Sequence, residues 1–352
     1  MKKWLVRLII ALLLVVGGAA AAFMRLFRLA ETPFQGYPAD RPAVVELPSG
    51  LGPQAIGQRL IDAGVVRDRW IYRMAIWRSG QARHLQAGDY RFDRPLSAID
   101  VVGKIARGEV DVVPLTFPEG LTIADMARVF EQSGLGSAAS FADAARETSV
   151  IRDLDPDAVD LEGYLFPDTY PLPRRASAPH VVRVMVERFV AVLTPEIRDA
   201  ARARGLSVRE LVTLASLVEK ETAKAEERPL VASVYTNRLR LGMALQCDPT
   251  VIYALQRAGR FDGNLRRDDL QYDSPYNTYR YPGLPPGPVA APGLASLRAA
   301  AEPATTSYLY FVSRNDGTHA FAETLAEHNR NVEKFQVKYF RAKRLADGRD
   351  AR

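Results

Sequence analysis

The chain has 352 residues, 47% of them apolar and 25% charged, so it can bury a sizeable core and is not a disordered protein. Its formal charge is +6, of which +5 comes from residues 1–28, because they hold five basic and no acidic side chains and leave 42 basic against 41 acidic residues elsewhere. A nearly neutral body removes the main argument for nucleic-acid binding. The single cysteine, Cys247, excludes an intramolecular disulfide framework, and the four scattered histidines lack a metal-ligand spacing.

Residues 8–24 form an uncharged apolar segment. At about 1.5 Å per residue, a helix of this length nearly crosses a hydrocarbon core of about 30 Å, and Arg25 and Arg28 can extend to the headgroups. We therefore predict a transmembrane helix over 8–28, after a cytoplasmic stretch at 1–7. The basic residues before it favour an inside amino terminus and a body outside the cytoplasm. A cleaved signal peptide is the alternative, because the run of alanines suits a peptidase.

A linker and a repeated unit are expected next. Residues 29–43 are rich in proline and small residues and have no apolar period, so we expect a linker there. A strand-like segment at 43–47 and an amphipathic helix follow, and the same strand, glycine turn and helix return 70 residues later. The matched positions are Pro48 and Pro118, Gly50 and Gly120, Leu51 and Leu121, Ile56 and Met126, Leu60 and Phe130, and Gly64 and Gly134.

Such a unit resembles the LysM module, which binds glycan chains that contain N-acetylglucosamine. A strand near Tyr90 and a helix over 98–106 would complete the first copy and give a LysM-like module over 44–112. The matched glycines and proline are a weak pattern that many βα units would show. A spacer that sets the height of the remaining chain above the membrane is therefore an alternative of equal weight to sugar binding.

Residues 113–352 predict a mixed α+β domain. Residues 161–173 are aromatic and proline-rich and predict a loop or short strand, after which a helix is expected to end at Gly205. Near the end of the chain, the Asp-Gly step in RNDGT lies between two apolar runs and predicts a β-hairpin. A charged closing helix should begin at about Thr324.

The stretch LVTLASLVEKET, residues 211–222, raises a question because it is an apolar run that ends in two glutamates. Ser207 and Glu210 predict a capping box at the start of its helix. On a helical wheel, Glu219 and Glu221 lie about 160° apart. The neighbours of Glu219 on the wheel are Val208, Val212 and Ala215, and those of Glu221 are Leu214 and Leu217.

The two glutamates cannot be a catalytic pair, because a retaining glycosidase needs carboxyl groups that face each other at about 5 to 5.5 Å. A single carboxyl on an apolar face tends to have a raised pKa and can act as a general acid. The wheel does not choose between Glu219 and Glu221. The structural alternative is a buried glutamate satisfied by an arginine such as Arg238, or by backbone amides.

Polar and aromatic residues follow this helix. A second helix is expected to end at Gly242, and Asp248 with Pro249 predicts the cap and first turn of a third helix. Amides and aromatic rings near a glutamate suggest a carbohydrate cleft, although each could also pack a rigid loop. The candidate substrate-binding residues are Asn237, Gln246, Asp248, Tyr253 and Asn277.

Several long motifs together resemble the YceG-like family of endolytic murein transglycosylases. They are FPEG at 117–120, LEGYLFPDTY at 161–170, the run from Glu219 to Tyr253, and YNTYRYPGLPPGP at 276–288. The resemblance extends from the apolar segment to about residue 335. It implies a YceG-like catalytic domain over 113–352 in a bacterial enzyme of the cytoplasmic membrane.

The resemblance also implies an activity. Such enzymes cut nascent peptidoglycan strands internally, at the β-1,4 bond between N-acetylmuramic acid and N-acetylglucosamine, and leave 1,6-anhydromuramic ends. The first glutamate of VEKET, Glu219, would be the catalytic acid, and no metal or organic cofactor is implied. Peptidoglycan strands and membrane peptidoglycan synthases are the implied partners. Cys247 is a departure, because relatives often have threonine there; we interpret it as a small packing residue.

Two other interpretations stay open. One is a glycan hydrolase that uses water on the same bond, with Asp248 or Asp168 as its second carboxylate. The other is a non-enzymatic glycan-binding scaffold that positions wall-synthesis partners at the membrane.

Overall fold

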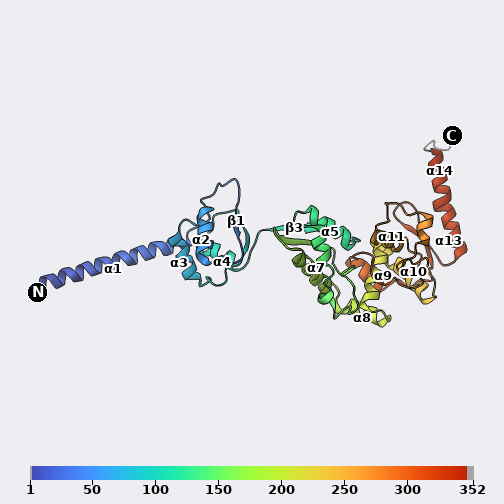
Figure 1. Cartoon of the computed structure of the whole chain (residues 1–352), viewed down its shortest axis with the longest axis horizontal. Helices are drawn as coiled ribbons and strands as arrows, with labels where there is room; N and C mark the ends of the chain where they lie inside the picture. The colour runs from blue at the N-terminus through green and yellow to red at the C-terminus, as the bar shows by residue number, and fades with distance from the viewer. Residues whose placement is uncertain (1, 347–352) are drawn as a thin grey trace. The chain divides into compact units, whose positions relative to one another are not determined.

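The computed structural model describes residues 2–346 and divides into two compact units. Unit 1 holds the chain up to Pro114 together with Pro171–Arg175, and unit 2 holds Leu115–Tyr170 and the chain from Ala176 onward (Figure 1). Helices predominate, and the described sheets each have two strands, paired β1-β2, β3-β4 and β5-β6. The mixed α+β class expected from the sequence is confirmed.

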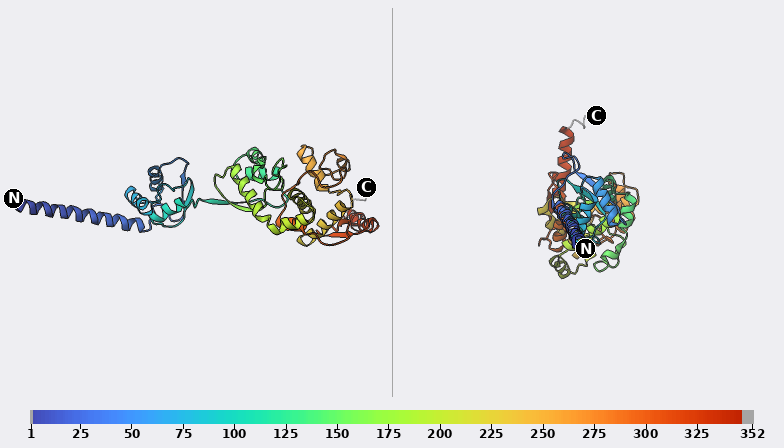
Figure 2. Two further views of the ribbon diagram at one scale, coloured as in Figure 1. Left: turned by 90° about the horizontal axis from the view of Figure 1, so that it is seen from below. Right: turned by 90° about the vertical axis from the view of Figure 1, so that its left-hand side faces the viewer.

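Helix α1, Lys2–Glu31, is one unbroken helix (Figure 2, left). Its apolar window has a mean hydropathy of 2.5 and is not buried, so by length and composition α1 can cross a membrane. Only its last turns join a core, where Ala30 is buried and Leu26 and Leu29 pack against unit 1. Helix α1 therefore has a long exposed apolar stretch, and only its carboxyl-terminal end packs against the rest of unit 1.

Residues 29–43 were expected to form a linker, but the first part of this stretch makes ordered contacts within unit 1. α1 continues into it, Phe34 forms an antiparallel bridge with Leu96, and the Gly36 amide donates to the Gly64 carbonyl over 2.8 Å. These contacts are made by backbone groups and one aromatic ring, so hydrophobic periodicity could not reveal them.

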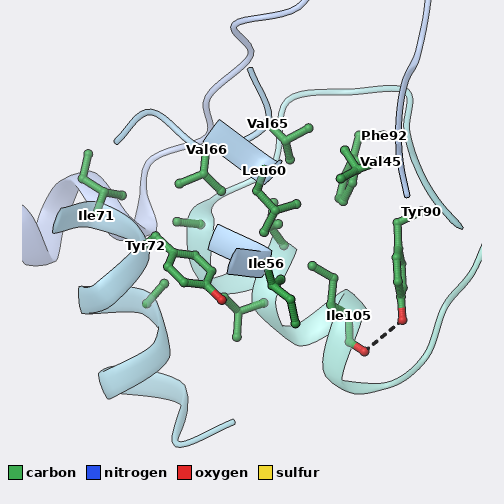
Figure 3. Packing of buried hydrophobic residues seen from close by; sticks show 14 of the residues in the cluster. Val45, Ile56, Leu60, Val65, Val66, Ile71, Tyr72, Tyr90, Phe92 and Ile105 are labelled. Carbon is green, nitrogen blue, oxygen red and sulfur yellow. Dashed lines mark hydrogen bonds between the residues drawn. The ribbon is translucent and has the colours of Figure 1, made fainter. Parts of the chain in front are cut away.

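Unit 1 is built on an antiparallel strand pair and three helices that follow α1. The bounds are β1 Ala43–Leu47, α2 Pro53–Asp62, α3 Arg69–Ser79, β2 Gly88–Phe92 and α4 Ala98–Ala106. Val45 opposes Tyr90 in the strand register, and both side chains belong to the buried cluster drawn in Figure 3. The Tyr90 hydroxyl donates to the Ile105 carbonyl over 3.2 Å, so this buried polar atom is satisfied. The strand near Tyr90 and the helix over 98–106 are as predicted.

The internal repeat is also structural. Strand β3, Val112–Thr116, and helix α5, Ile123–Gln132, follow in the same order as β1 and α2. The turn glycines that match, Gly50 and Gly120, have φ of 85° and 75°, in the left-handed region that favours glycine. This backbone requirement explains why glycine recurs at the same offset. The sugar-binding role of the first copy stays a prediction.

In unit 2, the helices α8, α10, α11 and α12 pack against α9. The helices up to α9 are α5, α6 Ala138–Ala144, η1 Thr148–Ile151, α7 Ala178–Val192, α8 Pro195–Ala203 and α9 Val208–Glu221. The later helices are η2 Ala225–Glu227, α10 Arg228–Arg240, α11 Asp248–Arg257, η3 Arg267–Gln271, α12 Leu294–Ala301, α13 Leu325–Val332, η4 Glu333–Lys338 and α14 Tyr339–Ala346. The hairpin strands of unit 2 are β5 Tyr310–Ser313 and β6 His319–Ala322, and β4 Thr169–Pro173 begins in unit 2 and ends in unit 1.

Helix α9 is buried on all sides. The predicted capping box is present, since the Ser207 hydroxyl accepts from the Glu210 amide and the Glu210 carboxylate accepts from the Ser207 amide. Every residue from Leu211 to Val218 is buried, because α8, α10, α11 and α12 all pack against this helix. A helix that is covered all round can hold a carboxyl group in a dry and fixed position.

Two sequence predictions for unit 2 need correction. The single helix expected up to Gly205 is two helices, because Pro195 has no amide donor and begins α8 after a break. Asp248 does not cap α11 with its side chain; Cys247 is the N-cap residue, and Asp248 is the first helical residue, followed by Pro249. The closing hairpin and the helix after Thr324 are as predicted.

Candidate active site

Glu219 lies near the carboxyl end of α9 with both carboxylate oxygens bonded. Its Oε1 accepts from Arg228 Nη2 over 2.9 Å, and its Oε2 accepts from the Gly293 amide over 2.9 Å. The side chain is only 5% exposed. Gly293 is the N-cap residue of α12, so the positive end of that helix dipole faces the carboxylate. An arginine and a helix terminus therefore hold this carboxyl in place.

A second carboxyl, that of Glu119, joins the same arginine. Glu119 Oε2 accepts from Arg228 Nη2 over 3.3 Å. The turn that carries Glu119 is fixed by backbone bonds to the segment before α12, because the Gly120 amide donates to the Ala291 carbonyl and the Ala291 amide donates to the Leu121 carbonyl. The FPEG motif therefore places the Glu119 carboxyl group beside the carboxyl end of α9.

The two carboxyls differ in solvent access. The Glu119 side chain is 48% exposed, whereas Glu219 is nearly buried. Partial burial raises the pKa of Glu119 above its usual range, and the charge of Glu219 and a hydrogen bond with it raise the pKa further, against the lowering effect of Arg228. Two carboxyls in contact share a proton more readily than they ionise together. One carboxyl of this pair is therefore open to solvent, whereas the other is nearly dry.

Arg228 is the cation that both acids share. It is the first residue of α10 and only 8% exposed, so packing rather than solvent fixes its guanidinium. Its Nε is buried and has no acceptor within residues 2–346. The contacts of Arg238 are different: that guanidinium donates to the carbonyls of Leu309, Ala244 and Leu245. The arginine that satisfies the glutamate is therefore Arg228, and the suggestion of Arg238 was wrong.

A residue larger than glycine at position 293 would displace the Glu119 carboxyl from its place beside Glu219. A Cβ added there would lie 1.8 Å from Glu119 Oε1. Glycine at this position thus lets the half-exposed carboxyl approach the amide that binds Glu219.

Glu221 has no part in this cluster. Its Oε1 accepts from the Tyr235 hydroxyl over 2.7 Å and from the Cys247 thiol over 3.1 Å. Burial raises the pKa of Glu221, and the two hydrogen bonds lower it by less. Cys247 is accordingly a buried donor to Glu221, a role that a threonine hydroxyl could also fill.

The predicted substrate-binding residues fall into two groups. The amides of Asn237 and Asn277 are used internally: Asn237 donates to the Thr306 and Tyr308 carbonyls, and Asn277 donates to those of Leu270 and Tyr272. These bonds favour a role in holding the loops. Gln246 and Asp248 are exposed on either side of Cys247, and Asp248 accepts from the Tyr279 hydroxyl over 2.5 Å.

Tyr253 lies elsewhere, against a second buried acid. Its hydroxyl donates to Glu162 Oε2 over 3.2 Å, and the Ile123 amide donates to Glu162 Oε1 over 3.1 Å. Burial raises the pKa of Glu162 to about 8, with a further contribution from Asp160. Both residues line a cavity of about 670 Å³ next to the start of α5. Tyr253 therefore belongs to this cavity wall.

The described part of the chain contains no recognisable metal-binding cluster. Within residues 2–346, no group of three or more His, Cys, Asp or Glu side chains is arranged to hold a metal ion. Both Glu119 and Glu219 instead form ion pairs with Arg228.

Comparison with known proteins assigns the chain to a family. Residues 45–334 match the YceG-like family, so the match includes Glu119, Glu219 and Arg228. The chain belongs to the YceG-like family. A relative from Bacillus subtilis (strain 168), named endolytic murein transglycosylase, is 32% identical over 307 residues, which are 83% of this chain and 84% of the relative.

Two further similarities support the YceG-like assignment. A relative with the same name from Streptococcus pneumoniae serotype 2 is 31% identical over 318 residues, which cover 82% of this chain and 57% of that longer relative. A crystal structure of a YceG-like protein from Listeria monocytogenes aligns with a TM-score of 0.56 at 32% identity, over 82% of this chain and 99% of that chain.

Sequence reasoning missed three members of the site in this YceG-like chain: Glu119, Arg228 and Gly293. Glu119 and Arg228 both stood within motifs that carried the family resemblance, so those motifs were the available clue. Arg228 begins α10 next to a proline, and Gly293 follows a proline, but neither position carries a local pattern that points to Glu219. Their conjunction depends on how α9, α10 and α12 pack.

Proposed function

We propose that this chain is a membrane-anchored endolytic lytic transglycosylase with Glu219 as its catalytic acid. The carboxyl pair beside Arg228 carries the proposal, since it combines a fixed, nearly dry carboxyl with a half-exposed neighbour that can retain a proton. Family membership and the names of the relatives from Bacillus subtilis and Streptococcus pneumoniae support the choice of murein as substrate.

The first chemical step is proton donation. Glu219 transfers its proton to the oxygen of the β-1,4 bond between N-acetylmuramic acid and N-acetylglucosamine, and the bond from the muramic anomeric carbon to that oxygen breaks. The sugar becomes oxocarbenium-like, while the departing strand keeps the proton as a hydroxyl. The carboxylate that forms is stabilised by Arg228 and by the Gly293 amide at the start of α12.

The second step closes a ring within the substrate. The Glu219 carboxylate removes the proton from the muramic 6-hydroxyl, and that oxygen bonds to the anomeric carbon to give a 1,6-anhydro end. The acid is thereby regenerated, and no water is consumed. Attack within one sugar also gains from proximity, so a second nucleophilic carboxylate is not needed.

Glu119 serves as the proton-sharing neighbour. Partial burial and the charge of Glu219 raise the pKa of Glu119, which favours a proton within the carboxyl pair, and the Glu119 side chain is half exposed to solvent. In this assignment Glu119 helps to retain the proton of the pair, whereas Glu219 acts on the glycan.

The membrane anchor is α1. Its apolar length and the basic residues before and after it are suited to a single span with an inside amino terminus. Both units would then lie outside the cytoplasm, where nascent peptidoglycan is found. Membrane peptidoglycan synthases are the partners that such a position would favour.

Product analysis tests the proposal. Purified peptidoglycan strands are digested with the full chain in detergent, and the fragments are analysed by mass spectrometry. We expect long fragments from internal cuts, each with a 1,6-anhydromuramic end. Reducing ends in their place would overturn the transglycosylase mechanism, and intact strands would favour the glycan-binding scaffold.

A hydrolase remains the second candidate function, for one specific reason: Glu119 gives Glu219 a carboxyl neighbour. The carboxyls suggested earlier are engaged elsewhere, since Asp168 pairs with Arg188 over 2.8 Å and Asp248 binds Tyr279. A water-using mechanism would therefore employ Glu119, and the same product analysis would reveal it through reducing ends.

A further inference from the structure

The chain has only three tryptophans, and all of them are exposed. Trp4 lies in the first turn of α1 and is 69% exposed, while Trp70 and Trp77 lie on α3 and are 52% and 66% exposed. Large aromatic side chains with this exposure on one short helix commonly mark an interaction surface. The question is what covers them.

The exposed side of α3 is opposite the side that builds the core of unit 1. Ile71 and Tyr72 are buried in that core (Figure 3). Trp70 and Trp77 are seven residues apart and so share one face of the helix, with Arg73 between them. This face is therefore not needed to hold unit 1 together.

The position of Trp77 relative to α1 sets its level with respect to a membrane. The ring of Phe23 in α1 meets the ring of Trp77 edge to face, with centroids 5.8 Å apart. From Trp4 to Phe23 a helix rises about 28 Å, close to the hydrocarbon thickness of about 30 Å. If α1 spans a bilayer, Trp4 lies at one boundary and Trp77 at the other. Tryptophan is enriched at both boundaries.

The charges around α3 match an anionic lipid surface. Residues 67–83 contain five arginines and a single acidic residue, Asp68, whose carboxylate caps α3. Between residues 2 and 346, no carboxylate forms an ion pair with Arg69, Arg73 or Arg78. Arginines without such partners are attracted to the phosphates of an anionic lipid surface.

A hollow of about 620 Å³ borders the same face, between α2 and α3. Its wall includes Arg69, Arg73 and Trp77 from α3 and Gln54 and Gln58 from α2. Such a hollow accepts a lipid headgroup or a sugar equally well. The contact between Trp77 and the apolar part of α1 decides in favour of lipid, because it brings this face to the boundary of the membrane.

We propose that α3 rests on the outer headgroup layer of the same bilayer that α1 crosses. Trp70 and Trp77 lie at the boundary with the acyl chains, and Arg69, Arg73 and Arg78 bind the phosphates of anionic phospholipids. Unit 1 is thereby fixed to the membrane surface at two places and cannot swivel freely about α1. The proposal rests on the proposed span of α1 and is independent of the catalytic assignment.

Intrinsic fluorescence tests the proposal, because Trp4→Phe leaves Trp70 and Trp77 as the only tryptophans. The full chain with Trp4→Phe is reconstituted into vesicles of phosphatidylethanolamine and phosphatidylglycerol, some with bromine near the headgroup end of the acyl chain and some with bromine near its methyl end. We expect emission at shorter wavelength than in detergent-free buffer and stronger quenching by the shallow bromine. Emission insensitive to either bromine would overturn the proposal.

Two controls separate the alternatives. Co-flotation of the protein with the vesicles reports on α1, so flotation without quenching rejects the role of α3 alone, and failure to float rejects the span and this proposal together. Soluble chitin oligosaccharides that shift the emission while bromolipids do not would identify a glycan surface instead. Catalytic activity is not used as a readout, so its loss would leave this result unchanged.

The charge contribution has a matched control. Arg69→Glu with Arg73→Glu should reduce shallow quenching in vesicles that contain phosphatidylglycerol and have less effect in phosphatidylcholine alone. The control pair Arg204→Glu and Arg240→Glu reverses two exposed arginines in unit 2 and should leave the quenching unchanged. Equal losses in both pairs would contradict a specific lipid contact by α3.

Discussion

The two glutamates at the end of α9 are two residues apart and have opposite surroundings. Glu219 meets an arginine, a helix terminus and a second carboxyl that is half open to solvent. Within residues 2–346, the side-chain hydrogen bonds of Glu221 are those from a buried hydroxyl and a buried thiol. Burial is the largest cause that raises the pKa of Glu221, yet none of these bonds comes from a cation or a helix terminus. The comparison teaches that a dry carboxyl becomes a candidate acid only when charge and access are supplied with it.

The largest expected effect is on activity at Glu219. Glu219→Gln removes the transferable proton while keeping the size of the side chain, so we expect a fall in the rate of strand cleavage of about 10² to 10⁴-fold. Glu221→Gln is the matched control and should stay within about tenfold of the wild type. Rates are measured from the release of new 1,6-anhydro ends. The reverse ranking of the two variants would transfer the catalytic role to Glu221.

The next effect is on stability and concerns Glu221. Glu221→Ala leaves the Tyr235 hydroxyl and the Cys247 thiol buried without their acceptor, which should lower the free energy of unfolding by about 2–3 kcal/mol. Denaturant titration of the wild type and the variant measures this loss. Tyr235→Phe in the same background should recover part of it, because the phenol no longer lacks a partner. A variant as stable as the wild type would show that these bonds contribute little.

A third buried acid, Glu162, should make the stability of the folded protein depend on pH. Its pKa is raised from 4.5 to about 8, so the folded protein binds a proton that the unfolded chain releases. The associated stability is full below the unfolded pKa and is lost as the pH rises toward about 8. We expect the wild type to lose roughly 1–2 kcal/mol between about pH 6 and pH 8.

Glu162→Gln is the variant that isolates this effect. Glutamine can still accept from the Ile123 amide but does not titrate, so the loss of stability over that pH interval should become smaller. Thermal unfolding at both pH values measures the difference. An unchanged pH dependence in Glu162→Gln would assign it to other groups.

The smallest expected effect tests the neighbour of Glu219. Glu119→Gln should lower the cleavage rate by about tenfold and move the alkaline limb of the pH–rate profile to lower pH, because the glutamine adds no negative charge to retain the shared proton. The profile separates this role from a structural one, which would lower the rate at every pH alike. A larger loss than in Glu219→Gln would make Glu119 the acid.

Much of the fold followed from local patterns. The apolar length of α1, the helix over 98–106, the capping box of Ser207 and Glu210 and the closing hairpin all depend on neighbouring residues, and the structure has each of them. The prediction of a single helix up to Gly205 was wrong. The apolar spacing continues through Pro195, but the proline backbone cannot continue the helix, so a new helix begins there.

Only part of the candidate site could be predicted from the sequence. The wheel separated Glu219 from Glu221, and the family resemblance chose Glu219. The amides of Asn237 and Asn277 matched a sugar site by residue type, but their carbonyl partners lie in other loops and could not be identified from spacing. Residue type indicates what a group can bind, whereas packing determines what it does bind.

Local sequence patterns were enough to predict the membrane-length helix, the repeated strand–turn–helix unit and the separation of the two glutamates, because each depends on the period of a single segment. The contact of Glu219 with Glu119 and Arg228 exists only in the folded chain, since Glu119 is 100 residues away from Glu219 and its approach requires the backbone bonds between its turn and Ala291. Contacts between distant segments are set by how whole helices pack, and no local pattern encodes them.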